Sequence, residues 1–312
     1  MATQLVPLME VERLSATVIR ILGGNPGQYT LQGTNTYLVG RGPQRLLVDS
    51  GEGLPCWPIA LKSVLAAEKA TVQKVLLTHW HHDHVRGVPD LLKICPNAKV
   101  YKNDPSPGQL NIEDGQVFEV EGATLRAFHT PGHAYDHMCF MFDEENAIFT
   151  GDNVLGHGTA VFDDLAAYVK TLKLMAARIS GIGYPGHGAI VQDCKSRIVE
   201  YLGHRQRRED EILQLLRTGL PELADYHDTE IQDQAVEQVT HSPASNPRSG
   251  PEVGYTPIEL VKHMYSETPV GLHWAAARGV GQVLAKLEGD GKVVSDGGSG
   301  KWRLTTTGRS SL

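Results

Sequence analysis

The sequence has few cysteines and no long apolar run, and each scarcity excludes a class of protein. Its four cysteines lie far apart and form no C-x-x-C pair in 312 residues. This excludes a disulfide framework and a thiolate zinc site, so reduced, buried thiols are expected. No window approaches the roughly 20 apolar residues of a membrane span. Glu10 and Glu12 lie where a signal peptide would be basic and then apolar, so we expect a cytoplasmic protein without membrane contact.

The chain also lacks an excess of positive charge. Its 29 lysines and arginines are outnumbered by 36 acidic residues, which gives a formal net charge of −7. Attraction to nucleic acid or to an anionic membrane is therefore not expected from overall charge. The hydrophobic fraction of 41% excludes a wholly disordered chain. The length predicts one large domain or two unequal ones.

Strand and helix patterns alternate over the first two-thirds of the chain. We expect strands at 16–22, 35–39, 45–49, 74–78, 99–101, 116–120, 124–129, 138–142 and 147–150. We expect helices at 57–69, 88–94, 164–180 and 194–217. Strands interleaved with helices predict an α/β domain whose loops can carry chemistry.

The character of the chain changes after this region. Residues 241–251 (H-S-P-A-S-N-P-R-S-G-P) have the composition of a linker, and residues 256–265 and 271–287 read as helices before a hairpin at 292–305. Helices followed by a hairpin predict a small winged-helix-like module. The predicted organisation is a catalytic domain at 1–203, a helical connector and polar linker at 204–255, and this module at 256–312.

Histidine is the residue that the sequence has in unusual concentration, because nine of 14 lie between positions 79 and 187. His79, His81, Asp83 and His84 directly follow a buried-strand pattern. Imidazoles and carboxylates suit Zn²⁺, and also iron or manganese where oxygen ligands contribute. Alternation along an extended segment points positions 79 and 81 to one side, while 83 and 84 are expected on a turn that can face a second ion. Such groups are costly to bury without a metal.

Three later residues complete a recognisable pattern: His133 in T-P-G-H, Asp152 in F-T-G-D and His187 in Y-P-G-H-G. Together with T-H-x-H-x-D-H at residues 78–84, they resemble the metallo-β-lactamase superfamily. The resemblance implies the αβ/βα sandwich of that superfamily with a C-terminal winged-helix-like module. It also implies two divalent metal ions, with zinc as the first expectation. One ion would be held by His79, His81 and His133, the other by Asp83, His84 and His187, with Asp152 bridging them.

Two cations about 3.5–4 Å apart can share and activate a water molecule and polarise a substrate oxygen. Asp83 could orient this nucleophile while it also binds metal, and it is the predicted catalytic residue. Thr78, Asp49 and Asp136 are candidates for orienting the ligand histidines, although the two aspartates could instead cap turns.

Some residues near the ligands are candidates for contact with substrate. His157 follows the bridging aspartate closely, and His137 and Tyr135 lie just after His133. For each of them, local packing is the alternative. The turn at 33–36 (G-T-N-T) either approaches the metals or is simple turn chemistry.

A closer resemblance narrows the reaction. The segments at 31–40 (L-Q-G-T-N-T-Y-L-V-G), 129–133 (H-T-P-G-H) and 149–158 (F-T-G-D-N-V-L-G-H-G) resemble fungal metallo-β-lactamase-type thioesterases that act with non-reducing polyketide synthases. This implies hydrolytic release of an aromatic polyketide, of anthraquinone-precursor type, from the acyl carrier protein of such a synthase. The animal lactamase-like endoribonucleases belong to the same branch and share the C-terminal module.

Two alternatives therefore remain. A single-strand endoribonuclease would use the same metals but would need a positive track for the RNA backbone. A nucleic-acid-binding winged-helix protein with a subordinate hydrolase domain would need a basic module. Residues 256–312 contain only seven lysines and arginines against five acidic residues. The charge therefore favours the thioesterase and makes a nucleic-acid partner unexpected.

Overall fold

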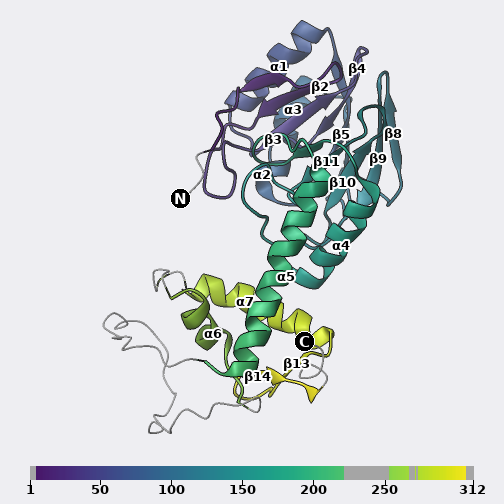
Figure 1. Ribbon diagram of the computed structural model, residues 1–312. Coiled ribbons are helices and arrows are strands. Elements are labelled where there is room, and N and C mark those ends of the chain that lie inside the picture. The colour runs from purple at the N-terminus through teal and green to yellow at the C-terminus, as the bar shows by residue number, and fades with distance from the viewer. Residues whose placement is uncertain (1–4, 221–252, 267–270, 272, 307–312) are drawn as a thin grey trace. The chain divides into compact units, whose positions relative to one another are not determined.

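The computed structural model describes residues 5–220, 253–266, 271 and 273–306 (Figure 1). The chain divides into two compact units, residues 1–203 and 204–312. The linker predicted at 241–251 lies outside the described residues. Within the described ranges, no helix combines the length and apolar character needed to cross a membrane.

The first unit contains a seven-stranded mixed sheet in which the strands follow chain order. Its strands are β1 (Val11–Arg13), β2 (Val18–Leu22), β3 (Asn35–Val39), β4 (Gln44–Val48), β5 (Thr71–Leu76), β6 (Lys99–Lys102) and β7 (Leu110–Asn111). The pairs from β1 to β4 are antiparallel, and those from β4 to β7 are parallel. Helix α1 (Cys56–Glu68) makes the crossover from β4 to β5 that a parallel pair requires.

A five-stranded sheet in the order β12-β11-β10-β9-β8 forms the other half of this unit. Its strands are β8 (Val117–Val120), β9 (Ala123–His129), β10 (Met138–Phe142), β11 (Ala147–Gly151) and β12 (Gly183–Pro185). Only β11 and β12 pair in parallel, and α4 (Leu165–Arg178) connects them. A short 3₁₀ helix, η1 (Asp143–Glu145), lies between β10 and β11.

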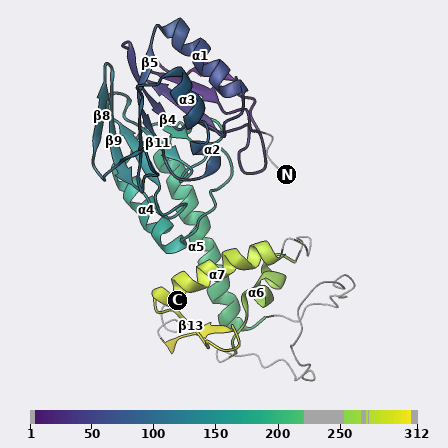
Figure 2. The same cartoon turned by 180° about the vertical axis from the view of Figure 1, so that it is seen from behind.

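Alternation along the strands builds two hydrophobic layers. In β4, Leu46 and Val48 join the cluster that contains Phe140 and Phe149 of the second sheet, so this cluster lies between the sheets. Leu47 points the other way, into a cluster with α1 and α3 (Val88–Ile94). Figures 1 and 2 show α1 and α3 outside the first sheet and α4 outside the second. The predicted αβ/βα sandwich is confirmed.

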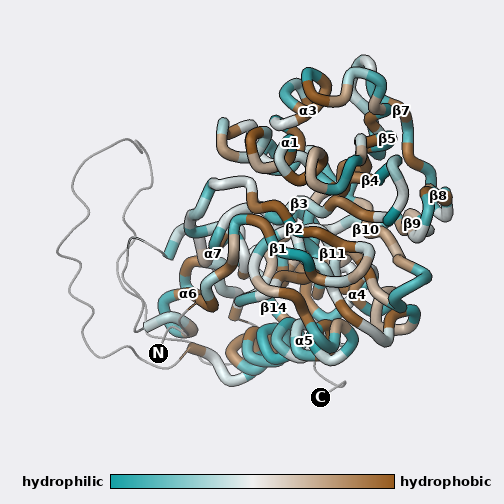
Figure 3. The backbone as a smooth tube through the Cα atoms, turned by 90° about the horizontal axis from the view of Figure 1, so that it is seen from above, coloured by the Kyte–Doolittle hydropathy of each residue, from teal (hydrophilic) through white to brown (hydrophobic). Residues whose placement is uncertain are grey.

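The second unit contains the winged-helix-like elements. They are α6 (Pro257–Met264), α7 (His273–Gly289) and the hairpin of β13 (Val293–Ser295) and β14 (Trp302–Leu304). Helix α6 begins with a capping box between Thr256 and Glu259, and Pro257 occupies its first turn, where a missing N–H costs nothing. Helix α5 (Cys194–Thr218) begins in the first unit and ends in the second, and Figure 3 shows it as mostly hydrophilic.

Most predicted elements occur within a few residues of their expected bounds, but one local expectation was wrong. Asp83 and His84 do not lie on an open turn, because residues His82–Val85 form the short helix α2. This helical turn redirects the chain after His81. The short strands β1 and β7 were not predicted from the sequence.

Candidate metal centre

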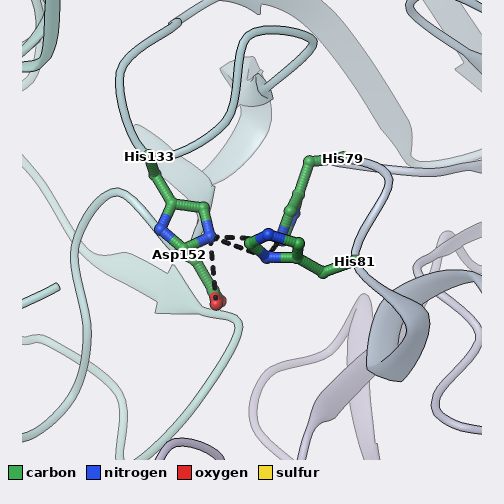
Figure 4. Close-up of side chains that lie close together, drawn as sticks. All are labelled: His79, His81, His133 and Asp152. Carbon is green, nitrogen blue, oxygen red and sulfur yellow. Dashed lines mark hydrogen bonds and ion pairs between the residues drawn. The ribbon is translucent and has the colours of Figure 1, made fainter. Parts of the chain in front are cut away.

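The candidate ligands come from segments that immediately follow strands. His79 and His81 follow β5, and Asp83 and His84 lie on α2. The other three, His133, Asp152 and His187, follow β9, β11 and β12 respectively. Figure 4 shows the side chains of His79, His81, His133 and Asp152 pointing toward one another. All seven candidate ligands thus meet at one edge of the sandwich.

Three histidines and Asp152 form the first group, whose ligand atoms all lie within 4.8 Å of one another. Nδ1 of His81 is 2.9 Å from Nε2 of His79 and 3.0 Å from Nε2 of His133. Oδ2 of Asp152 is 3.6 Å from Nε2 of His133. This is the set that the resemblance assigns to one ion, with Asp152 at its edge.

Asp83, His84 and His187 form the second group, within the same limit. Oδ2 of Asp83 is 3.3 Å from Nε2 of His84 and 3.2 Å from Nε2 of His187. Asp152 also reaches this group, since its Oδ1 is 3.4 Å from Nε2 of His84 and its Oδ2 is 3.3 Å from Nε2 of His187. Asp152 therefore lies between the two groups, where a bridging ligand has to be.

The outer ring nitrogens of two ligand histidines, His133 and His84, are held by hydrogen bonds to the protein. Nδ1 of His133 lies 2.9 Å from the carbonyl oxygen of Val161, and Nδ1 of His84 lies 2.8 Å from Oδ2 of Asp49. Both acceptors require a proton on Nδ1, so that the neutral form of each ring presents the lone pair of Nε2 to the cluster. The surroundings thus select the tautomer that can bind a metal.

Asp49 supports a second histidine indirectly. Its carboxylate accepts hydrogen bonds from the backbone N–H of Thr78 at 2.8 Å and from the Thr78 hydroxyl at 2.9 Å. The same hydroxyl lies 2.9 Å from Nδ1 of His79. Asp49 adopts a left-handed backbone conformation with φ of 59°, which is uncommon for a residue with a side chain. Of its two predicted roles, the structure supports orientation of ligands.

Asp136 has a different role from the one considered for it. Its Oδ2 lies 2.5 Å from Nζ of Lys102, and both side chains are buried. Burial raises the pKa of the Asp136 carboxyl. The residue forms a buried ion pair with β6 rather than orienting a ligand histidine.

Burial dominates the electrostatics of the first group. It lowers the pKa of His79 well below its ordinary value, and it lowers the pKa of His81 to about 4, with the neighbouring histidines adding to both effects. These two imidazoles are therefore neutral at pH 7, which is the form that binds a metal.

Carboxylates dominate the second group. Burial lowers the pKa of His84 and His187, but the neighbouring carboxylates, Asp152 foremost, together outweigh it and raise the pKa of His84 well above its ordinary value and that of His187 to about 9. Burial likewise raises the pKa of Asp83, but His84 and His187 hold it well below its usual range. In the metal-free protein, the protonated imidazoles of His84 and His187 thus compensate the negative charge of the Asp83 and Asp152 carboxylates. A bound cation would compensate the same charge.

Two buried polar atoms suit a bound cation. Nε2 of His84 and Oδ1 of Asp152 lie 3.4 Å apart, and among the described residues both have ion-pair contacts but no hydrogen bond. Burying such atoms without a hydrogen bond is costly unless another group binds them. Gly186, which precedes His187, keeps this space open, because a side chain there would collide with Oδ1 of Asp152. The residues present therefore fit a metal centre.

Comparison with known proteins shows the family. The Metallo-beta-lactamase superfamily matches residues 29–107 and 100–204, which is more than half of the chain. The chain belongs to the metallo-β-lactamase superfamily. The Beta-lactamase associated winged helix domain matches residues 256–302, which confirms the expected C-terminal module.

Curated relatives of this superfamily member come from fungi. It is 44% identical over 304 residues to an "Atrochrysone carboxyl ACP thioesterase" from Aspergillus chevalieri, covering 96% of this chain and 91% of the relative. It is 53% identical over 214 residues to "Lactamase-like protein ptaB" from Pestalotiopsis fici, covering 68% of each. A beta-lactamase domain protein from Burkholderia ambifaria shares the fold, with a TM-score of 0.72 at 15% identity over 95% of this chain and 93% of that one.

A cavity of about 560 Å³ opens beside the ligand groups of this metallo-β-lactamase superfamily member. Its lining includes the apolar side chains of Leu31, Leu155 and Val161 and the rings of Tyr29 and Trp80. Trp80 is 42% exposed and Tyr29 is 73% exposed. Among the lining residues there is no lysine or arginine.

The three residues predicted to contact substrate have different positions. His157 lines the cavity, as expected of a substrate contact. Tyr135 does not line it; its ring is 61% exposed, and its hydroxyl donates to Oδ2 of Asp104 at 2.7 Å. His137 does not line it either, since it is completely buried. The structure therefore places neither Tyr135 nor His137 in the wall of this cavity, and a substrate contact by either residue stays a prediction.

His137 supports the cluster from behind instead. Its Nε2 accepts a hydrogen bond from the backbone N–H of Asp152 at 3.1 Å, and its Nδ1 lies 2.9 Å from the hydroxyl of Thr130. Burial lowers the pKa of His137 well below its ordinary value, so the ring is neutral and can accept this bond. The sequence shows a histidine near the site but not which way its ring points.

Sequence reasoning also missed a contact to Asp83. The hydroxyl of Thr34 donates to Oδ2 of Asp83 at 3.0 Å, and Asn25 contacts Thr34 in turn. The G-T-N-T turn was considered as an approach to the metals, whereas Asn25 carried no signal. Its role depends on a packing contact that only the folded chain shows.

Proposed function

We propose that this protein is a metal-dependent thioesterase. It hydrolytically releases an aromatic polyketide, of anthraquinone-precursor type, from the acyl carrier protein of a non-reducing polyketide synthase. The observation that carries the proposal is the meeting of seven candidate metal ligands beside a largely apolar cavity without lysine or arginine. A relative matching 96% of this chain is named as a thioesterase for an acyl-carrier-protein-bound substrate, which supports the same reaction here.

The metal content that we propose is two divalent ions, with zinc preferred and manganese or iron compatible with the donors. His79, His81 and His133 would hold one ion, and Asp83, His84 and His187 the other, with Asp152 between them. Five imidazoles and two carboxylates suit zinc, and the carboxylate oxygens keep the other two metals compatible. The four free cysteines of the chain fit a reducing compartment, which supports a cytoplasmic location.

Bound divalent ions supply a water molecule of lowered pKa and polarise a carbonyl oxygen. The chain contributes a proton acceptor, because Asp83 lines the cavity and the imidazoles of His84 and His187 keep its carboxylate ionised. Asp83 is therefore placed to orient the attacking water and take its proton. A thiolate is a good leaving group, so the reaction needs no strong general acid at this site.

The cavity walls account for the choice of acyl group. An uncharged, flat acyl chain can desolvate against Leu31, Leu155 and Val161 and stack on the ring of Trp80. His157 is placed to hydrogen-bond a keto or phenol oxygen of the substrate. An RNA backbone would require cationic partners that this lining does not offer.

One panel tests the proposal. The purified protein is incubated with an acyl-carrier-bound aromatic polyketide, with a small acyl-thioester and with single-stranded RNA, and its metal content is measured. We expect rapid release of the polyketide acid, slower turnover of the small thioester and no RNA cleavage. Asp152→Asn should abolish turnover, whereas Asp143→Asn, at an exposed aspartate remote from the ligand set, should not. RNA cleavage that depends on Asp152, without thioester turnover, would overturn the proposal.

A further inference from the structure

The buried hydroxyl of Thr34 touches the candidate ligand set at one defined atom. It donates to Oδ2 of Asp83 at 3.0 Å. This is the same oxygen that lies 3.2 Å from Nε2 of His187 and 3.3 Å from Nε2 of His84. Thr34 itself is fully buried. The bond therefore selects which carboxylate oxygen of Asp83 faces the two histidines.

Asn25 determines the direction of that hydroxyl. Its Oδ1 accepts the backbone N–H of Thr34 at 2.9 Å, which fixes the orientation of the amide. The amide Nδ2 then donates to the Thr34 hydroxyl oxygen at 3.0 Å. Because this oxygen already accepts a bond from Asn25, its single hydrogen is free to point to Asp83.

The same segment also holds the loop that carries His187. Thr34 forms an antiparallel bridge with His187, and the backbone N–H of Asn35 donates to the carbonyl oxygen of Gly186 at 2.7 Å. The amide of Asn35 donates to the carbonyl oxygens of Pro185 and Gly188 at 2.8 and 2.9 Å. Two members of the second group are therefore positioned by residues far away in the sequence, near the start of β3.

We propose that Thr34 and Asn25 are positioning residues for the second metal site. Asn25 aims the Thr34 hydroxyl, and the hydroxyl holds the Asp83 carboxylate in the rotamer that places Oδ2 beside His84 and His187. The first group does not depend on this bond. The inference rests on the proposed metal-binding function.

The test compares three variants of the full chain with wild type by titration of the metal-free protein with zinc. Thr34→Val keeps the side-chain shape and removes the hydroxyl, whereas Thr34→Ser keeps it. Asn25→Asp keeps the acceptor for the Thr34 N–H but loses the amide donor. Thr36→Val is the matched control, because Thr36 is a buried threonine two residues further along, in β3, whose hydroxyl donates to the carbonyl oxygen of Ile21 and accepts from Nε1 of Trp57.

We expect wild type to bind two zinc ions. Thr34→Val and Asn25→Asp should weaken one binding step by about 10–100-fold and leave the other unchanged, which is the usual effect of removing a group that orients a metal ligand. Thr34→Ser and Thr36→Val should bind as wild type. Circular dichroism identifies any variant that does not fold. If Thr34→Val does not fold, the comparison of Asn25→Asp with Thr34→Ser still tests the inference.

Several results would overturn the inference. If Thr34→Val and Asn25→Asp bind both zinc ions with the affinities of wild type, the inference is overturned and the proposed function stays intact. An equal loss in Thr36→Val would do so as well, because packing of the strand would then be the cause. Failure of wild type to bind zinc and to hydrolyse the thioester would instead remove the proposed function together with this inference.

Discussion

Replacing Asp49 with asparagine should weaken metal binding without disturbing the fold. The amide oxygen can still accept the backbone N–H of Thr78, and asparagine tolerates the left-handed backbone conformation at position 49. The amide nitrogen, however, cannot accept the proton on Nδ1 of His84. If the imidazole shifts that proton to Nε2 in order to avoid the clash, the lone pair that faces the cluster is lost.

The size of the effect follows from the bond that is removed. A hydrogen bond to a charged group contributes about 1.5–3 kcal/mol. Loss of a group that orients a ligand histidine costs about 10–100-fold in metal affinity, which corresponds to about 1.4–2.8 kcal/mol. The two estimates agree, so we expect Asp49→Asn to lower zinc affinity by one to two orders of magnitude.

The assay is a competition titration against a chromophoric chelator at pH 7.5. Asp143→Asn is the control, because its exposed carboxylate lies 3.4 Å from Arg126 and contacts no candidate ligand. The metal-free Asp49→Asn protein should unfold at a lower midpoint, because the bond to His84 is present without metal; zinc affinity is therefore compared at a temperature where both variants are folded. Wild-type zinc affinity in Asp49→Asn would refute the claim that Asp49 acts through His84.

Three further predictions follow from other features. Lys102→Met breaks the buried ion pair with Asp136 and should destabilise the fold by about 3–5 kcal/mol in urea unfolding. Combining it with Asp136→Leu should recover much of this loss of stability. An unchanged stability of the single variant would contradict a buried ion pair. Zinc affinity should rise with pH from 6.5 toward 9, because a protonated imidazole does not bind metal. Asp152 raises the pKa of His187 against the effect of burial, so that His187 stays protonated in the metal-free protein until about pH 9. The same raised pKa stabilises the metal-free fold fully below pH 6.5, and this stabilisation is lost as the pH rises through 9. Calorimetric titrations with zinc that show a constant affinity across this pH range would count against a raised pKa of His187. Trp80→Ala should lower kcat/KM for an aromatic acyl-thioester by about 5–10-fold through loss of stacking, with a small acetyl-thioester as the unaffected control; equal losses for both substrates would refute a stacking role.

The sequence was sufficient to predict those parts of the fold that depend on local pattern. In β4, alternate apolar residues face the two hydrophobic layers, and this period of two is visible in the sequence. The T-H-x-H-x-D-H motif and the three later residues identified all seven side chains that the structure brings together. The short strand β7 has two exposed residues and no such pattern, so it could not be predicted.

The residues around the ligands were harder to predict, because their roles depend on partners far away in the chain. His137 and His157 looked alike in sequence, yet one is buried behind Asp152 and the other lines the cavity. Asp49 and Asp136 were equal candidates, and the folded structure separates them, because Asp49 contacts His84 whereas Asp136 contacts Lys102. Orientation of a side chain is a property of the folded packing, and a single sequence does not contain it.

The segment at 155–161 has a consequence for how new substrate preferences can arise. It supplies side chains to the cavity wall, but its support for His133 comes from the main-chain oxygen of residue 161, which every amino acid carries. Side chains here can therefore be exchanged while the bond that orients the ligand histidine persists. Selectivity for the acyl group can thus change, in evolution or in a mutant library, while the metal ligands and their hydrogen bonds stay the same.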